Sequence, residues 1–157
     1  MRKFGGVLLA AAMVLSVGLI AAPAGAAAGP QCAALKTKTA NGKLTASLSK
    51  CTPTAATGGA GGGTFAAAAK GTKSGTLAIT ITWATGHGTS KGNVTFTTAK
   101  GFGKCPKGTT SLLTIGGKVI GGTGTAAKTI KVGQKISAAV CAGATSDTLE
   151  PGTVLAI

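Results

Sequence analysis

Residues 75–83 read Gly-Thr-Leu-Ala-Ile-Thr-Ile-Thr-Trp, and this stretch decides the fold class. The large apolar residues occupy every second position: Leu77, Ile79, Ile81 and Trp83. Successive side chains of a β-strand point to opposite faces, so the alternation predicts a long strand with one buried face.

The same alternation returns elsewhere in the chain. Two segments repeat it: 93–97, with Val94 and Phe96 inward, and 135–140, with Ile136, Ala138 and Val140 inward. Shorter candidate strands are residues 112–115, 118–120, 129–132 and 153–157, while residues 65–70 fit one helical turn or an edge strand. Threonine is abundant, and glycine-rich breaks separate the segments. The sequence therefore predicts an all-β domain, an antiparallel β-sandwich of the Ig-like or a similar type.

Asn41-Gly42 predicts the turn of the first hairpin, because both central residues of a type I′ turn need positive φ. Pairing outward from this turn matches residues whose numbers sum to 83, which places Cys32 opposite Cys51. The chain has four cysteines, so we expect the disulfides Cys32–Cys51 and Cys105–Cys141. The two bridges would contribute roughly 3 and 4 kcal/mol to the free energy of unfolding.

One detail of this hairpin conflicts with strict alternation. Alternation puts Cys32 and Cys51 on the face opposite Leu35 and Leu48. We expect a β-bulge near residues 49–52 to bring both pairs to the same face.

Residues 1–26 have the pattern of a secretory signal peptide. Arg2 and Lys3 precede an uncharged, mostly apolar run, and Ala24-Gly25-Ala26 fits the A-x-A cleavage site, with cleavage after Ala24 or Ala28 as alternatives. The run has about 16 residues, fewer than the ~20 that cross a bilayer, which favours a signal peptide over a membrane anchor. No transmembrane segment is expected in the chain that remains after cleavage. We predict that residues 27–157 form a single domain that is secreted and extracellular, either free or associated with the cell wall.

The predicted mature domain is strongly basic. Removal of Arg2 and Lys3 lowers the formal charge from +14 to +12, and the remaining basic residues are all lysines. Such a charge attracts polyanions, and an anionic cell-wall polymer is the partner that fits export. Base-specific readout usually uses arginine, and binding of single strands uses exposed aromatic rings, so no sequence-specific nucleic-acid binding is expected.

The candidate polyanion contacts are Lys100, Lys104 and Lys107, which lie on one short loop with Cys105. The alternative is a diffuse basic surface that keeps the protein soluble. The even spread of lysines favours this alternative. A diffuse surface predicts that neutralising the three loop lysines costs as much polyanion affinity as neutralising three lysines of the first hairpin. Those hairpin lysines are Lys36, Lys38 and Lys43.

Catalysis is not expected. Most hydrolytic, phosphoryl-transfer and metal chemistry needs clustered carboxylates, histidines or thiols, and the chain has two acidic residues and one histidine. There is no C-x-x-C pair for a metal ion, and no cofactor is predicted. Two alternatives remain open: a wall hydrolase that uses Asp147 or Glu150, and a carrier of a small apolar ligand between the sheets.

Two short motifs resemble those of serine enzymes. Residues 88–92 fit G-x-S-x-G beside His87, but they join two predicted strands rather than a strand and a helix. Residues 47–50 fit S-x-x-K, but on a strand Ser47 and Lys50 point to opposite faces. We interpret residues 88–92 as a glycine-rich hairpin loop and residues 47–50 as part of a strand.

Several segments carry a resemblance to a group of proteins. They are the signal peptide, the start Gln31-Cys32-Ala33-Ala34-Leu35, the glycine-rich stretch 57–64, and the ending Leu149-Glu150-Pro151-Gly152-Thr153. Together they resemble small exported actinobacterial proteins of unassigned function, which are rich in lysine, glycine and threonine and contain two disulfides. The resemblance covers most of the chain and implies no activity.

Overall fold

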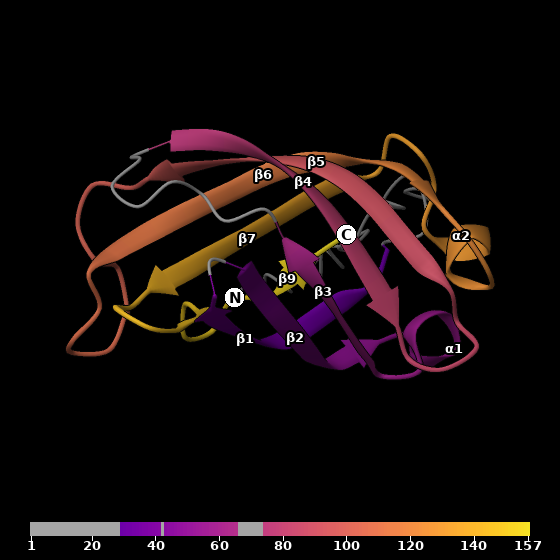
Figure 1. Ribbon diagram of the computed structural model, residues 1–157, viewed down its shortest axis with the longest axis horizontal. Coiled ribbons are helices and arrows are strands. Elements are labelled where there is room, and N and C mark those ends of the chain that lie inside the picture. The colour runs from indigo at the N-terminus through magenta and orange to yellow at the C-terminus, as the bar shows by residue number, and fades with distance from the viewer. Residues whose placement is uncertain (1–28, 42, 66–73) are drawn as a thin grey trace, which may run out of the picture.

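The computed structural model describes residues 29–41, 43–65 and 74–157. The elements in these residues are β1 (Gln31–Ala40), β2 (Lys43–Thr52), α1 (Thr54–Thr57), β3 (Ala60–Phe65), β4 (Ser74–Trp83), β5 (Thr89–Thr98), β6 (Ser111–Gly122), α2 (Ala126–Thr129), β7 (Lys135–Ala142), β8 (Asp147–Leu149) and β9 (Leu155–Ala156). Each of the strands β1 to β7 pairs antiparallel with the next strand, and β8 also pairs with β1. The sheet therefore closes into an eight-stranded antiparallel β-barrel (Figure 1).

The short strands β8 and β9 share one position in this barrel. Both pair with β7 on one side and with β1 on the other. Thr148 of β8 pairs with Lys36, and Ala156 of β9 pairs with Gln31 five residues further back along β1. Residues 150–154 separate the two strands, so they lie one after the other in the gap between β7 and β1.

The β-sandwich, Ig-like or similar, that the sequence predicts is wrong, although the all-β class is confirmed. A sandwich consists of two separate sheets, whereas here β3 pairs with both β2 and β4 and so joins the two halves. Glycines allow β3 to do this, because a Cβ on Gly61 would collide with the ring of Trp83. A Cβ on Gly63 would collide with the carbonyl oxygen of Thr80.

Most of the predicted strands are present. β4, β5 and β7 contain the three alternating segments, and their predicted inward residues are buried except Leu77, which is half-buried. Residues 112–115 and 118–120 form one strand, β6, and only two residues of 153–157 pair in the barrel. The strand predicted at residues 129–132 is wrong, because this segment contains the end of α2 and a turn. Residues 1–26 and 66–70 lie outside the described residues.

The first hairpin has the predicted register, with Leu35 opposite Leu48 and Cys32 opposite Cys51. Asn41 has the expected positive φ of 52°, while Gly42 lies outside the described residues. The two disulfides join Cys32 to Cys51 and Cys105 to Cys141, which are the predicted pairs.

The expected bulge near residues 49–52 is absent, because the register is the same on both sides of Lys50. Lys50 instead has a φ of 55°, in the left-handed region. Two successive outward or half-buried residues then separate Cys51 from Leu48, and two separate Cys32 from Leu35. All four side chains are consequently buried in the barrel interior.

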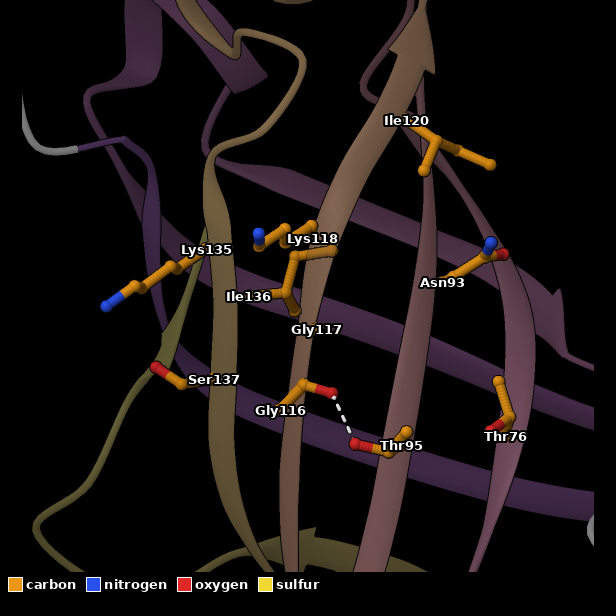
Figure 2. Close-up of a pocket in the computed structure, with 10 residues that line it drawn as sticks. All are labelled: Thr76, Asn93, Thr95, Gly116, Gly117, Lys118, Ile120, Lys135, Ile136 and Ser137. Atoms are coloured by element: carbon orange, nitrogen blue, oxygen red, sulfur yellow. Dashed lines mark hydrogen bonds between the residues drawn. The ribbon is translucent and has the colours of Figure 1, made fainter.

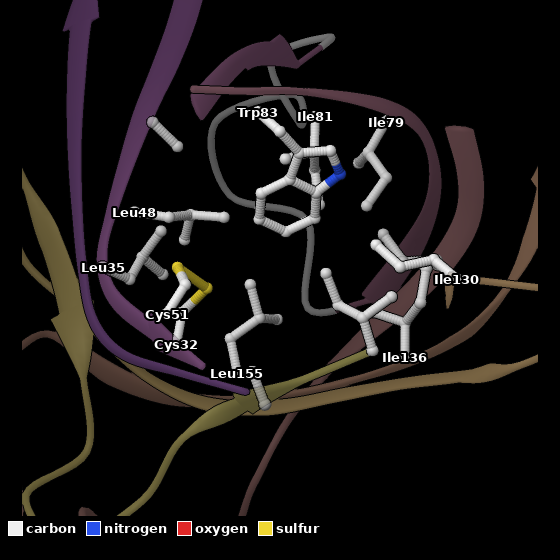
Figure 3. Packing of buried hydrophobic residues seen from close by; sticks show 14 of the residues in the cluster. Cys32, Leu35, Leu48, Cys51, Ile79, Ile81, Trp83, Ile130, Ile136 and Leu155 are labelled. Atoms are coloured by element: carbon white, nitrogen blue, oxygen red, sulfur yellow. A yellow bond between two sulfur atoms is a disulfide. The ribbon is translucent and has the colours of Figure 1, made fainter. Parts of the chain in front are cut away.

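The barrel interior is filled by side chains (Figure 3). The residues at its centre include Leu48, the disulfide Cys32–Cys51, Ile81, Trp83, Val119, Ile136 and Leu155. Trp83 donates a hydrogen bond from Nε1 to Oγ of Ser90 at 2.8 Å, which satisfies the one polar atom of the indole. An eight-stranded barrel is just wide enough for side chains to fill it, and this interior is a packed core.

The connections divide between the two ends of the barrel. Neighbouring strands run in opposite directions, so the connections after β1, β5 and β7 lie at one end, and those after β2, β4 and β6 lie at the other. α1 and α2 follow β2 and β6 and cover the second end, on the right of Figure 1. The loop that carries Lys100, Lys104 and Lys107 follows β5 and lies at the first end.

Candidate functional site

Positive charge covers the outside of the barrel. Every lysine in the described part of the chain is exposed: Lys36, Lys38, Lys43, Lys50, Lys91, Lys100, Lys104, Lys107, Lys118, Lys128, Lys131 and Lys135. No ion pair involves these lysines among the described residues. The surface charge is therefore not neutralised by neighbouring acidic groups.

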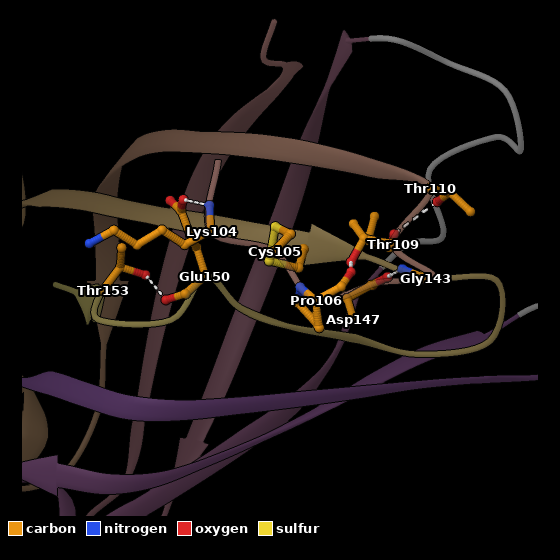
Figure 4. The surroundings of a disulfide bond; sticks show 11 residues. Lys104, Cys105, Pro106, Thr109, Thr110, Gly143, Asp147, Glu150 and Thr153 are labelled. Atoms are coloured by element: carbon orange, nitrogen blue, oxygen red, sulfur yellow. Dashed lines mark hydrogen bonds between the residues drawn. A yellow bond between two sulfur atoms is a disulfide. The ribbon is translucent and has the colours of Figure 1, made fainter. Parts of the chain in front are cut away.

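The two carboxylates are both held by neutral groups. Asp147 accepts hydrogen bonds from Oγ1 of Thr37 at 2.8 Å and from the backbone N–H of Gly143 at 3.3 Å. Glu150 accepts a hydrogen bond at 2.7 Å from the backbone N–H of Lys104 (Figure 4). Both side chains are half-buried and fix connections at one end of the barrel. They have structural roles in this geometry.

An open depression of about 660 Å³ lies on the outer face of β4 to β7 (Figure 2). We call it the outer trough; it is lined by Thr76, Asn93, Thr95, Gly116, Gly117, Lys118, Ile120, Lys135, Ile136 and Ser137. Gly116 leaves its centre free of side chains, because a Cβ placed there would meet no atom within 4 Å. Thr95 donates a hydrogen bond to the carbonyl oxygen of Gly116 at 3.1 Å. The lining offers the hydroxyl groups of Thr76, Thr95 and Ser137 and the amide of Asn93, and it has no aromatic ring.

Strand register brings two lysines together in this trough. Lys118 on β6 lies directly opposite Lys135 on β7, and Asn93 on β5 lies opposite Lys118 on its other side. Like charges at directly opposite positions of an antiparallel pair destabilise the sheet by roughly 0.2–1 kcal/mol. The trough thus combines two like-charged side chains with neutral hydrogen-bonding side chains.

The lysines singled out by the sequence do not line this trough. Lys100, Lys104 and Lys107 are exposed on the connection between β5 and β6, which the disulfide Cys105–Cys141 joins to β7. Lys38 and Lys43 flank the turn between β1 and β2, at the same end of the barrel. The topology therefore places the lysine loop and the first hairpin, which are far apart in the sequence, at one end of the barrel.

The residues of the two serine-enzyme motifs have structural contacts. Ser90 is 3% exposed and accepts the Trp83 hydrogen bond in the core. The backbone of His87 accepts a hydrogen bond from the N–H of Ala126 at 2.9 Å and so fastens α2, and the ring lies 3.4 Å from Oγ1 of Thr125. Ser47 donates to the carbonyl oxygen of Lys36 at 3.4 Å. These contacts stabilise strand ends and connections.

The described residues contain no group of three or more His, Cys, Asp and Glu side chains that could hold a metal ion. No helix among them is long and apolar enough to cross a membrane. The two disulfides are consistent with an extracellular protein.

Comparisons with protein families, with curated proteins and with solved structures found no match for this chain.

Sequence reasoning missed the Lys118–Lys135 pair. The connection between β6 and β7 spans residues 123–134 and includes α2, so no tight turn fixes the register of these strands. The first hairpin has such a turn, and its register followed from Asn41-Gly42. The sequence offers a weaker indication of this site than a tight turn would give. Gly116-Gly117 lies directly before Lys118, and two residues without side chains leave a hollow on the surface of a strand.

Proposed function

We propose that this protein is a secreted, non-catalytic binding protein for an extracellular polyanion, such as an anionic cell-wall polymer. The observation that carries the proposal is the charge arrangement: all described lysines are exposed and unpaired, and both carboxylates are held by neutral donors. A surface of this kind binds polyanions by displacing their counterions.

The alternatives have less support. A wall hydrolase would need Asp147 or Glu150 free to move a proton, and each is engaged in a hydrogen bond that holds a connection in place. A carrier of an apolar ligand would need space inside the barrel, where Trp83, Ile81 and Leu48 pack together. Neither role uses the basic surface.

The outer trough is the proposed point of closest contact. Lys118 and Lys135 supply two adjacent positive charges, while Asn93, Thr76 and Ser137 supply neutral hydrogen-bonding groups for the units between the anionic groups. The absence of aromatic rings from the trough lining disfavours stacking on sugar rings or bases. This chemistry suits a linear polymer whose phosphate or carboxylate groups alternate with hydroxyl-bearing units.

The double variant K118Q/K135Q tests the proposal. We expect its affinity for a poly(glycerol phosphate) polymer to fall about ten-fold, equivalent to about 1.4 kcal/mol. Each lysine that contacts an anionic group adds about one unit to the salt slope, so the slope should fall by about 1 to 2 units. Isothermal titration calorimetry at several salt concentrations measures both quantities.

The same variant should become more stable while it binds less. Removing the like-charge repulsion is expected to raise the free energy of unfolding by roughly 0.2–1 kcal/mol, measured by urea denaturation. The matched control is K36Q/K38Q, which removes two exposed lysines of β1 outside the trough. Gly116→Val fills the trough without a change in charge and should also weaken binding. Equal losses from the control and from K118Q/K135Q would contradict a defined site and support a diffuse basic surface.

A further inference from the structure

The loop formed by residues 100–107 presents an aromatic ring to solvent among lysines; we call it the Phe102 loop. Phe102 is 54% exposed, whereas Trp83 and Phe96 are 3% and 6% exposed. Lys100, Lys104 and Lys107, on either side of Phe102 in the sequence, are exposed as well. We propose that this loop docks the protein on an anionic lipid bilayer, with the ring of Phe102 in the interface and the lysines against the lipid headgroups.

The backbone holds Phe102 at the tip of the loop. Gly101 and Gly103 have φ values of 80° and 51°, a region that favours glycine, so the chain turns sharply on both sides of the ring. The backbone N–H of Cys105 donates to the carbonyl oxygen of Phe102 at 2.9 Å and closes the turn. A Cβ on Gly103 would overlap with the Glu150 carboxylate, so the loop also packs tightly against the barrel.

Two further contacts fasten the loop to the barrel (Figure 4). The backbone N–H of Lys104 donates to Oε1 of Glu150 at 2.7 Å, and the disulfide joins Cys105 to Cys141 of β7. After the disulfide, Thr110 donates two hydrogen bonds to the carbonyl oxygen of Ala142, both at 2.8 Å. A loop that is ordered before binding loses little conformational entropy when it contacts its partner.

The surrounding charge favours an anionic partner at this end of the barrel. The turn between β1 and β2 adds Lys38 and Lys43 to the same end. The nearby Glu150 carboxylate accepts the Lys104 backbone N–H and pairs with no lysine side chain. Each lysine near an anionic membrane surface adds to the binding.

The exposed ring is the reason to choose a bilayer over a soluble polymer. A hydrophilic polyanion would contact the lysines but would leave Phe102 in water. An anionic bilayer offers both negative headgroups and an apolar layer directly beneath them, which is the combination that basic segments with phenylalanine recognise. The proposed site is separate from the outer trough, since none of its residues lines that depression.

Vesicle binding tests this inference. Co-sedimentation with vesicles of phosphatidylglycerol and phosphatidylcholine should show binding that vesicles of phosphatidylcholine alone do not support.

The triple variant K100Q/K104Q/K107Q should lose on the order of 100-fold in vesicle affinity. Phe102→Ser should lose about five-fold, because about half of the residue's surface is already buried in the free protein. Phe102→Trp provides a reporter whose emission should shift to shorter wavelength with anionic vesicles, above a constant signal from the buried Trp83.

Val132 supplies a matched control. It is 73% exposed beside Lys131 and lies on the connection at the opposite end of the barrel. Val132→Ser should leave vesicle affinity unchanged. Phe102→Ser should also leave affinity for the soluble poly(glycerol phosphate) polymer unchanged, which separates this inference from the proposed function.

Three results would overturn the inference. The first is unchanged vesicle binding by Phe102→Ser, and the second is an equal loss from Val132→Ser. The third is a loss by Phe102→Ser of affinity for single-stranded DNA with no loss for vesicles, which would assign the ring to base stacking instead.

Discussion

Replacing Cys32 and Cys51 by alanine is expected to lower the free energy of unfolding by about 3 to 5 kcal/mol. The bridge closes a segment with a sequence separation of 19, and the loop entropy it removes from the unfolded chain corresponds to about 3 kcal/mol. Both cysteines also lie in the core, at 0% and 1% exposure, next to side chains of the main hydrophobic cluster (Figure 3). Loss of the two sulfur atoms therefore leaves a cavity in addition.

The second bridge provides the comparison. Cys105–Cys141 has a sequence separation of 36, so loop entropy alone predicts a somewhat larger effect, about 4 kcal/mol. Cys141 is buried, at 3% exposure, but Cys105 is only half-buried and neither cysteine belongs to the main hydrophobic cluster, so their loss leaves less of a cavity. We expect C105A/C141A to be the milder double variant in urea denaturation under oxidising conditions. The reverse order would mean that loop entropy, and not core packing, dominates the contribution of these bridges.

Strand positions could be predicted wherever one face of a strand is buried. β4, β5 and β7 have a buried face and an exposed face, and their apolar residues alternate accordingly. β3 could not be predicted in this way, because Gly61, Gly62 and Gly63 carry no side chains that alternate. The same glycines permit the close contact of β3 with β4, so the segment that is hardest to recognise is the one that joins the two halves of the barrel.

Barrel closure itself depends on contacts between distant residues. β1 meets β8 and β9, more than 100 residues further along the chain, through only a few paired residues. The alternation of apolar residues is the same for a strand in a sandwich and for a strand in a barrel, because each has one face toward a core. The sequence pattern therefore specifies the inner face of each strand but does not specify which strands pair to close the sheet.

The candidate site was harder to predict than the disulfides. The Cys32–Cys51 pairing followed from a two-residue turn that fixes the register of its hairpin. The Lys118–Lys135 pair depends on a register that no tight turn specifies, and the exposure of Phe102 depends on tertiary contacts of its loop. In the sequence the lysines are spread evenly. Only the strand topology shows which lysines share an end or a face of the barrel.

Trp83→Ala is expected to destabilise the barrel by about 3 to 5 kcal/mol. The ring is 3% exposed and packs against Gly61, where a Cβ would collide with it, so its removal opens a cavity between β3 and β4. It also leaves Oγ of Ser90 without the donor that lies 2.8 Å away in the core. Thermal or urea denaturation followed by circular dichroism measures the loss.

A double-mutant cycle separates the hydrogen bond from the packing. Trp83→Phe retains an aromatic ring but leaves Ser90 unpaired, and Ser90→Ala leaves the indole N–H unpaired, so each variant should lose about 1 to 3 kcal/mol beyond its change in packing. W83F/S90A leaves no polar atom of this pair unpaired, and it should be more stable than the sum of the single effects predicts. Strict additivity would contradict a direct contribution of the hydrogen bond. The destabilisation of Trp83→Ala would then come from lost packing alone, where Gly61 of the glycine-rich strand β3 lies against the ring.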